Sequence, residues 1–140
     1  MKSVFADSSY WIALLNPRDD LHDKAVAVSA SLGIVRYVTS QLVLTEVLNY
    51  FAAHGVALRR AAIELVQQLH IHPQTTVIPQ SPAEFQDAFA LYAERDDKTW
   101  GLTDCASFQV RHRELITEAL SHDKDFEQAG FKALLREPTR

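Results

Sequence analysis

The chain has 140 residues, of which 47% are hydrophobic and 23% charged, the composition of an ordinary globular protein with one hydrophobic core. No apolar run approaches the roughly 20 residues of a membrane span, and the single cysteine, Cys105, excludes an internal disulfide. The net charge of −4 argues mildly against nucleic-acid binding, unless a bound metal ion neutralises part of the acidic excess. We expect one domain over residues 1–140, without a membrane segment and in the reducing cytoplasm.

The first half of the chain predicts short strands that alternate with pairs of helices. In chain order we expect a strand, two helices, a strand and two further helices, over residues 3–6, 8–15, 22–32, 36–39, 41–54 and 58–70. Ser8 or Ser9 would cap the first of these helices, and Ser40 the third, because a serine hydroxyl can accept a free N–H group at a helix start. Gly33 would close the second helix.

The second half continues the same alternation. We expect strands at residues 75–78, 118–120 and 132–135, and helices at 82–95, 104–112 and 126–128. The sequence Ser81-Pro82-Ala83-Glu84 is typical of a helix start, and Thr103 and Asp125 are the expected caps of the last two helices. Strands that alternate with helices predict an α/β fold with a parallel sheet and helices on both faces.

Four acidic residues lie at the ends of these predicted elements. Asp7 follows the first strand and Asp123 the fourth, where the functional crevice of an open parallel sheet lies. Asp104 falls in the first turn of its helix, where the helix dipole favours an anion. Glu46 lies one turn inside an otherwise apolar helix, on a narrow polar stripe with Gln41, Thr45 and Asn49.

Each of these acids also has an ordinary structural explanation when it is taken alone. Asp7 could be a helix cap and Glu46 a solvated position. Asp104 could stand where the helix dipole favours a negative charge, and Asp123 could be a turn residue. Taken together in this topology, however, they would form a cluster of like charges that repel one another. A bound divalent cation removes that repulsion, so we interpret the four acids as one metal site.

The segments around these acids resemble the successive motifs of a known family. They read Val4-Phe5-Ala6-Asp7-Ser8-Ser9, Leu44-Thr45-Glu46-Val47-Leu48, Thr103-Asp104-Cys105-Ala106-Ser107 and Ser121-His122-Asp123-Lys124-Asp125. Their order and spacing are similar to those of PIN-domain nucleases, with VapC-type toxin ribonucleases and stand-alone relatives as the nearest subgroup. The resemblance covers residues 4–135, and the Thr-Asp-Cys-x-Ser block is its most specific part. Gly101 and Ser121 depart from residues common among relatives, but neither departure removes a carboxylate.

The resemblance implies a single PIN-like domain with a five-stranded parallel sheet in the order 3-2-1-4-5. It also implies single-strand-specific endoribonuclease activity with Mg²⁺ or Mn²⁺, and frequent homodimerisation. Oxygen ligands alone suit these hard cations, which would activate water for phosphodiester hydrolysis. Asp7 and Asp104 would be the main direct ligands, and Glu46 and Asp123 would bind a second ion or hold and deprotonate water. Asp125 remains an alternative to Asp123 as the fourth acid.

Other side chains have weaker predicted roles. Ser8 and Ser121 are expected to orient carboxylates in the site. Trp11 is expected in the core or a dimer interface, Cys105 in the core, and Trp100 either in the core or stacked on an RNA base. We also expect apolar surface for a homodimer, and for a small antitoxin that places a basic side chain near the acids; this surface would comprise Tyr10, Trp11, Leu14, Leu15, Phe51 and Leu58.

Rival classes of small α/β proteins fit less well. A receiver domain needs an acceptor aspartate after the third strand, where Pro79-Gln80 stands, and a haloacid-type phosphatase needs Asp-x-Asp where Asp7-Ser8-Ser9 stands. We therefore predict a metal-dependent endoribonuclease that cleaves single-stranded or structured RNA, as the toxin of a toxin–antitoxin pair. The alternative is a non-catalytic PIN-fold scaffold that binds protein or RNA, since a fold alone does not determine a function.

Overall fold

The computed structural model describes residues 1–138, and its centre is one sheet of five parallel strands in the order β3-β2-β1-β4-β5. The strands are β1 (Ser3–Ala6), β2 (Arg36–Ser40), β3 (Thr75–Ile78), β4 (Glu118–Leu120) and β5 (Lys132–Ala133). The predicted strand order is confirmed. The last strand is shorter than expected, because the chain turns into a 3-10 helix at Leu134–Arg136.

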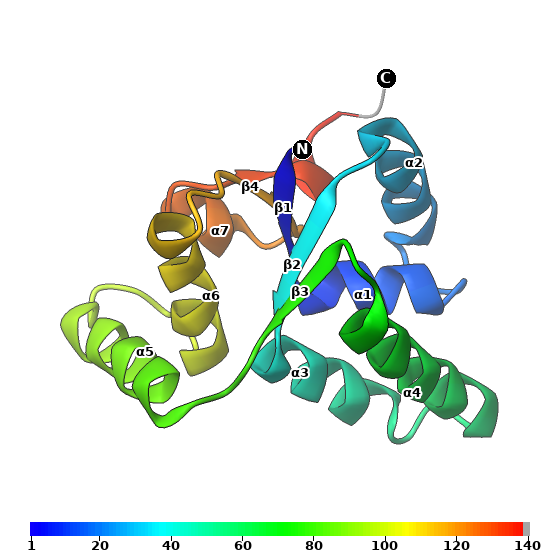
Figure 1. Cartoon of the computed structure of the whole chain (residues 1–140), viewed down its shortest axis with the longest axis horizontal. Helices are drawn as coiled ribbons and strands as arrows, with labels where there is room; N and C mark the ends of the chain where they lie inside the picture. Colours follow the sequence, from blue (N-terminus) through cyan, green and yellow to red (C-terminus); the bar gives the residue numbers. More distant parts are fainter. Residues whose placement is uncertain (139–140) are drawn as a thin grey trace.

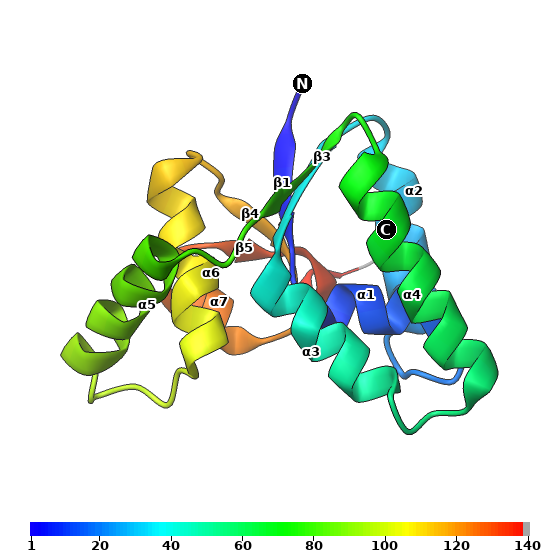
Figure 2. The same ribbon diagram turned by 60° about the horizontal axis from the view of Figure 1, so that its bottom comes forward.

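Helices cover both faces of the sheet (Figures 1 and 2). They are α1 (Ser8–Leu15), α2 (His22–Leu32), α3 (Gln41–Phe51), α4 (Val56–Ile71), α5 (Pro82–Glu94), α6 (Leu102–Arg113) and α7 (Lys124–Gln128). Helices α1, α2 and α4 lie on one side and α5, α6 and α7 on the other, while α3 lies below the ends of the strands. The chain changes sides where it crosses from β3 back to β4, which places the topological switch point between β1 and β4, where an open parallel sheet is expected to form its functional crevice.

Two of the predicted helix caps are confirmed. The Ser40 hydroxyl accepts a hydrogen bond from the Val43 N–H at 3.2 Å, and the Ser81 hydroxyl accepts one from the Glu84 N–H at 3.2 Å. Both hydroxyls satisfy an N–H group that has no partner within its own helix.

Three helix starts near the crevice differ from the prediction. Asp7, and neither of the two serines after it, occupies the cap position of α1, although its side chain makes no capping hydrogen bond. Helix α6 begins after Gly101 instead of Thr103, and Asp123, not Asp125, caps α7. An acid is the cap residue of α1 and α7 and lies in the first turn of α6, where the helix dipole favours a negative charge.

The hydrophobic core holds three of the six side chains that we expected at an interface, and the other three are partly buried against it. Tyr10 is 2% exposed, Trp11 4% and Phe51 0%, so the apolar surface predicted for a partner is largely internal. Trp100 is 6% exposed and packs edge-on against Phe108, which excludes it as an open stacking platform for a base. Tertiary packing, which the local sequence does not specify, accounts for these differences. None of the helices within residues 1–138 is long and apolar enough to cross a membrane.

Candidate metal centre

The site begins where β1 and β4 end side by side. Phe5 pairs with Ala119 and Ala6 with Leu120, and the Asp7 N–H then donates to the Leu120 carbonyl at 3.2 Å. The parallel register therefore brings the residues that follow the two strands, Asp7 and Ser121, into contact.

Asp7 is the most deeply buried acid of the site, with 7% of its surface exposed. Its Oδ2 atom accepts hydrogen bonds from the hydroxyls of Ser9 at 3.1 Å and Ser121 at 3.0 Å. Burial raises the pKa of the Asp7 carboxyl and the charge of Asp123 adds to this, while hydrogen bonds from the Ser8 backbone, Ser121 and Ser9 oppose it. A buried carboxylate held by two hydroxyls has a fixed orientation, as a metal ligand requires.

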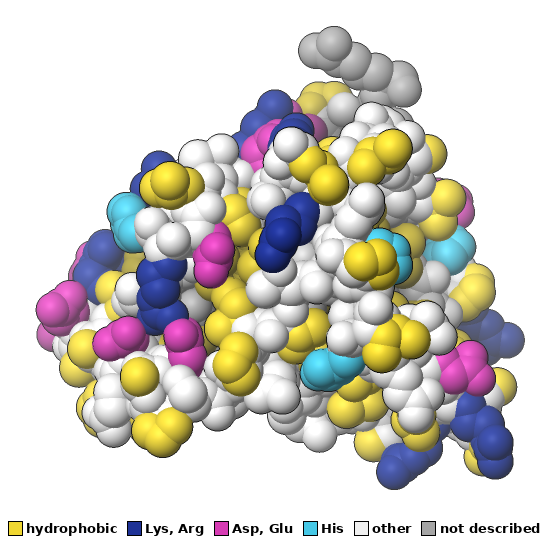
Figure 3. Space-filling model, viewed as in Figure 1, with side chains coloured by type: hydrophobic (Ala, Val, Ile, Leu, Met, Phe, Trp, Pro, Cys, Tyr) yellow, Lys and Arg dark blue, Asp and Glu magenta, His cyan; other side chains and the backbone are white. Residues whose placement is uncertain are grey.

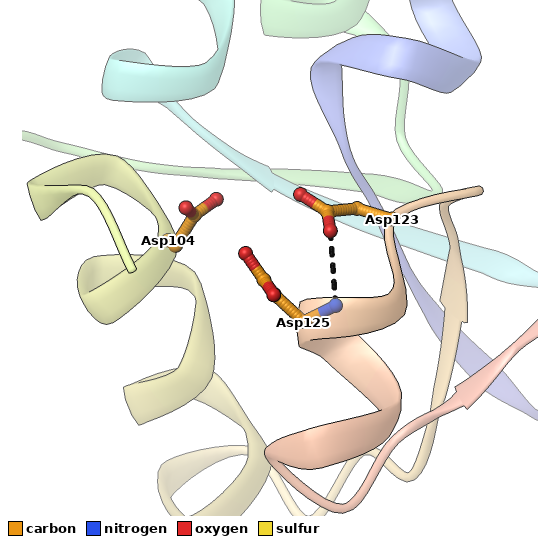
Figure 4. A group of neighbouring side chains, drawn as sticks. All are labelled: Asp104, Asp123 and Asp125. Carbon is orange, nitrogen blue, oxygen red and sulfur yellow. Dashed lines mark hydrogen bonds between the residues drawn. The ribbon is translucent and has the colours of Figure 1, made fainter. Parts of the chain in front are cut away.

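Three further carboxylates converge on one point beside Asp7. One oxygen each of Asp104, Asp123 and Asp125 lies within 4.8 Å of the others. Figure 4 shows that Asp104 reaches this point from α6, whereas Asp123 and Asp125 reach it from the start of α7. The Asp125 N–H donates to Asp123 Oδ1 at 2.9 Å, so the cap of α7 also fixes the spacing of its two acids.

This crowding changes the acidity of the group. The pKa of Asp104 is raised to about 6, first by burial and then by the charges of Asp7, Asp123 and Asp125, although its Oδ2 accepts the Gly101 N–H at 3.0 Å. Burial and Asp123 likewise raise the pKa of Asp125, while the nearby cations Lys124 and Lys98 lower it. Acids whose pKa values are raised by burial and by one another's charges indicate that the site is suited to a compensating positive charge.

Glu46 faces the same crevice from α3. Although the residue as a whole is exposed, partial burial of its carboxyl group raises its pKa, and the charges of Asp7 and Asp104 raise it further. A hydrogen bond from the Ser8 side chain opposes that shift. The four predicted acids and Asp125 therefore form one electrostatic cluster, although Asp7 and Glu46 lie outside the group of three converging oxygens.

The structure adds two residues to the predicted site. Ser121 contacts Asp7 and Ser8 bonds Glu46, so both predicted serines bond carboxylates of the site, and Ser9 is the second hydroxyl on Asp7. Asp125 joins the cluster together with Asp123 instead of replacing it. The consecutive hydroxyls after Asp7 were the sequence signal for this arrangement, since the second of them returns toward the cap residue when a helix begins there.

The donor chemistry fits a hard divalent cation. The converging ligand atoms are carboxylate oxygens, and within residues 1–138 no histidine or cysteine belongs to the group. Oxygen-only sets favour Mg²⁺, Ca²⁺ or Mn²⁺ over zinc or copper.

Comparison with known proteins agrees with this geometry. The PIN domain family model matches residues 4–132. The chain belongs to the PIN domain family. It is 31% identical over 131 residues to the 23S rRNA-specific endonuclease VapC20 of Mycobacterium tuberculosis, in strains CDC 1551 / Oshkosh and ATCC 25618 / H37Rv, covering 91% of this chain and 95% of the relative.

A crystal structure of the same PIN-domain relative is similar over nearly its whole length. It superposes with a TM-score of 0.81 at 26% sequence identity, and the match covers 92% of this chain and 96% of that chain. That structure is described as VapC20 of Mycobacterium tuberculosis, a toxin that cleaves the sarcin–ricin loop. The predicted PIN fold and the resemblance to VapC-type nucleases are both confirmed.

Proposed function

We propose that this PIN-domain protein is a metal-dependent endoribonuclease and the toxin of a toxin–antitoxin pair. The observation that carries the proposal is the meeting of five carboxylates at the carboxyl ends of β1 and β4. Such a cluster costs stability, because burial and like charges raise the pKa of several members. A scaffold that only bound partners would gain nothing from that cost. The similarity to an rRNA endonuclease supports the same reading.

Mg²⁺ or Mn²⁺ is the proposed cofactor. Asp104, Asp123 and Asp125 would hold the ion. Asp7 and Glu46 lie beside it and would either bind it directly or hold its water. When bound, such an ion stabilises the negative charge that develops on a phosphodiester and lowers the pKa of water. The proposed catalytic set is Asp7, Glu46, Asp104 and Asp123, as predicted from the sequence.

The protein's own groups have distinct roles in this proposal. Ser9 and Ser121 fix the orientation of Asp7, so that its carboxylate needs no rearrangement when substrate arrives. Glu46, with a raised pKa and a position facing both Asp7 and Asp104, is suited to take a proton from the attacking water. The N–H of Gly101 holds Asp104 at the start of α6.

The proposed substrate is RNA, and the proposed protein partner is a small antitoxin. The relative VapC20 acts on 23S rRNA, so ribosomal RNA is the first natural substrate to test. We also propose that the protein acts in the cytoplasm. The non-catalytic scaffold would be expected to have lost part of the acidic cluster, and all four predicted acids are present.

The decisive experiment is a cleavage assay with purified protein, single-stranded RNA and intact ribosomes. Cleavage should need Mn²⁺ or Mg²⁺, stop with EDTA, and fall about 100-fold or more in Asp104→Asn and Glu46→Gln. Glu114→Gln removes an exposed acid at the far end of α6 and serves as the matched control, with unchanged activity expected. If the wild type cuts no RNA, or if all variants cut equally, the scaffold alternative is correct.

A further inference from the structure

The segment before α6 carries two cations beside the acidic cluster. Arg95 lies over the Trp100 ring, with its guanidinium carbon 4.9 Å from the ring centroid, and Lys98 Nζ lies 5.8 Å from the same centroid. The turn closes through a hydrogen bond of 3.1 Å from the Lys98 N–H to the Arg95 carbonyl. We call residues 95–100 the cationic turn. Trp100 anchors it, since its indole N–H donates to Gln128 Oε1 on α7 at 3.2 Å.

The two cations of this turn differ in how far they are neutralised. Arg95 forms a bidentate ion pair with Asp97, in which its Nε and Nη2 atoms donate to the two carboxylate oxygens at 2.9 and 3.1 Å. Lys98 has no carboxylate within 4.0 Å in the part of the chain that the structure describes, and its charge acts on Asp97 and Asp125 over longer distances. A compact ammonium that forms no close ion pair is suited to bind a phosphate group.

Cations act on the acidic cluster from the side of α7. Lys98 and Lys124 both act on Asp125, whereas the groups that act on Glu46 are Ser8, Asp7 and Asp104 and include no cation. An RNA strand that crosses the cluster would therefore meet attraction along α7 and the cationic turn, and repulsion along α3. Phosphate contacts dominate the affinity of proteins for nucleic acid, so this asymmetry sets the path of the strand.

A surface cavity of about 210 Å³ opens behind the cationic turn, between α5, α6 and α7. Arg95 and Trp100 form part of its wall, and Gln109 and Gln128 bring amide groups to it. The cavity is smaller than the pockets that hold drug-sized ligands, which points to a group such as a single planar base. Side-chain amides can both donate to and accept from the edge of a base, and single-stranded RNA can turn its bases outward into such pockets.

From this juxtaposition we infer a binding subsite for one nucleotide of the RNA substrate, with its phosphate on Lys98 and its base in the cavity lined by Gln109 and Gln128. The inference rests on the proposed function, because it names where the substrate of that same site is held. Lys98 is a positioning residue in this scheme. It binds the phosphate next to the one that is cut. The strength of that contact is the same in the ground state and in the transition state.

The test compares Lys98→Gln with Lys98→Arg and with Lys132→Gln. Lys132 is an exposed lysine at the start of β5, so Lys132→Gln makes the same change in net charge away from the carboxyl ends of the strands. Binding of a labelled single-stranded RNA is measured with Ca²⁺, an oxygen-seeking ion, at salt concentrations of about 50 to 200 mM. Cleavage with Mn²⁺ gives KM and kcat for each variant.

The inference requires a specific pattern of results. Lys98→Gln should weaken binding several-fold and reduce the slope of log Kd against log salt concentration by about 0.7, the value for one phosphate contact on a single strand. KM should rise with kcat nearly unchanged, since a contact that is equal in the ground and transition states acts on binding alone. Lys98→Arg should restore both quantities, and Lys132→Gln should match the wild type. Gln109→Leu should alter the base preference next to the cut without changing the salt slope.

Other outcomes overturn the inference and are distinct from failure of the proposed function. If Lys98→Gln behaves like Lys132→Gln, no phosphate binds there. If kcat falls while KM and the salt slope stay constant, Lys98 acts on the acidic cluster and not on RNA. If base preference is unchanged in Gln109→Leu, the base does not enter the cavity. A wild type that binds RNA without cutting it contradicts the proposed nuclease, yet the salt slope of Lys98→Gln still decides the subsite.

Discussion

The Ser121 hydroxyl donates a hydrogen bond of 3.0 Å to Oδ2 of Asp7, a residue 114 positions earlier in the chain. The same hydroxyl oxygen accepts the N–H of Asp123 at 3.1 Å. One buried hydroxyl therefore joins the end of β1 to the start of α7, and so couples the placement of two acids that come from different strands. The site depends on this link as well as on its carboxylates.

We predict that Ser121→Ala weakens both the fold and the metal site. The change leaves the partly buried Asp123 N–H without its acceptor and Asp7 with one donor fewer, which should cost about 1–3 kcal/mol in the free energy of unfolding. Affinity for Mn²⁺ should fall about 10- to 100-fold, as is usual when a ligand loses its orienting partner. Urea unfolding and calorimetric titration measure the two effects. Ser31→Ala, which removes an exposed hydroxyl bonded to Val28, should change neither.

Metal binding should stabilise the folded protein. Mn²⁺ relieves the repulsion among the carboxylates only in the folded state, so the melting temperature should rise with its concentration. The gain should shrink in Asp7→Asn and Asp104→Asn, and either variant should melt at or above the wild type when metal is absent. A wild-type melting temperature that is indifferent to millimolar Mn²⁺ would contradict the proposed metal centre.

The metal-free protein should also lose stability as the pH rises. The pKa of Asp104 is raised to about 6 in the fold, against an ordinary value of 3.8, so between these values the folded state binds more protons than the unfolded state. Its contribution is complete below about pH 4 and lost above about pH 6. Allowing for the water that screens this partly exposed group, the loss is about 1–2 kcal/mol. Asp104→Asn should flatten this part of the stability curve, and an unchanged curve would refute the assignment.

Saturating Mn²⁺ should reverse the direction of that pH dependence. Protons and metal compete for the same carboxylates, so the stabilisation that Mn²⁺ provides should decrease as the pH falls through about 6. Thermal melts with and without the ion, at the same series of pH values, measure the difference directly. A gain that is constant across this range would mean that the ion binds elsewhere.

The sequence predicted the sheet well because its signals are strong and local. Short apolar strands, β-branched in β3, and the Ser40 and Ser81 caps specify the alternation, and parallel connections then leave few topologies. Helix starts within the acidic loops were harder, since any of several neighbouring side chains can accept the same N–H groups. Asp123 and Asp125 are two residues apart, and only the backbone conformation shows that Asp123 accepts the N–H of Asp125.

The sequence predicted which acids form the site, but not which other residues contact them. Their positions after strands and at helix starts indicated one cluster, because parallel strands end at a common edge. The partners of that cluster come from tertiary structure. Ser9 bonds Asp7 because Asp7, and neither of the two serines, occupies the cap position of α1, and Lys98 lies near Asp125 because Trp100 packs into the core. Burial of Trp100 had no clear signal in a polar loop.

The roles of Asp123 and Asp125 can be separated with asparagine substitutions. Asparagine caps a helix about as well as aspartate, so Asp123→Asn removes the charge while it keeps the start of α7. We predict that Asp123→Asn lowers RNA cleavage more than Asp125→Asn, and that both weaken Mn²⁺ binding because both oxygens belong to the converging group. Greater loss in Asp125→Asn would make Asp125 the fourth catalytic acid. Far-ultraviolet circular dichroism checks that α7 persists in both variants.

The homodimer remains a prediction, and the exposed face of α5 is where we now expect it. Phe85, Phe89 and Tyr92 are 40%, 52% and 54% exposed and recur at helical spacing, and Figure 3 shows hydrophobic side chains over this helix, interspersed with acidic ones. A stripe of this kind can pair with its own copy about a two-fold axis. Light scattering should give twice the monomer mass for the wild type, and Phe89→Ser should shift it toward the monomer. Ile34→Ser, at an isolated residue that is 78% exposed, should leave the dimer intact. A wild type that stays monomeric at every concentration would contradict the prediction.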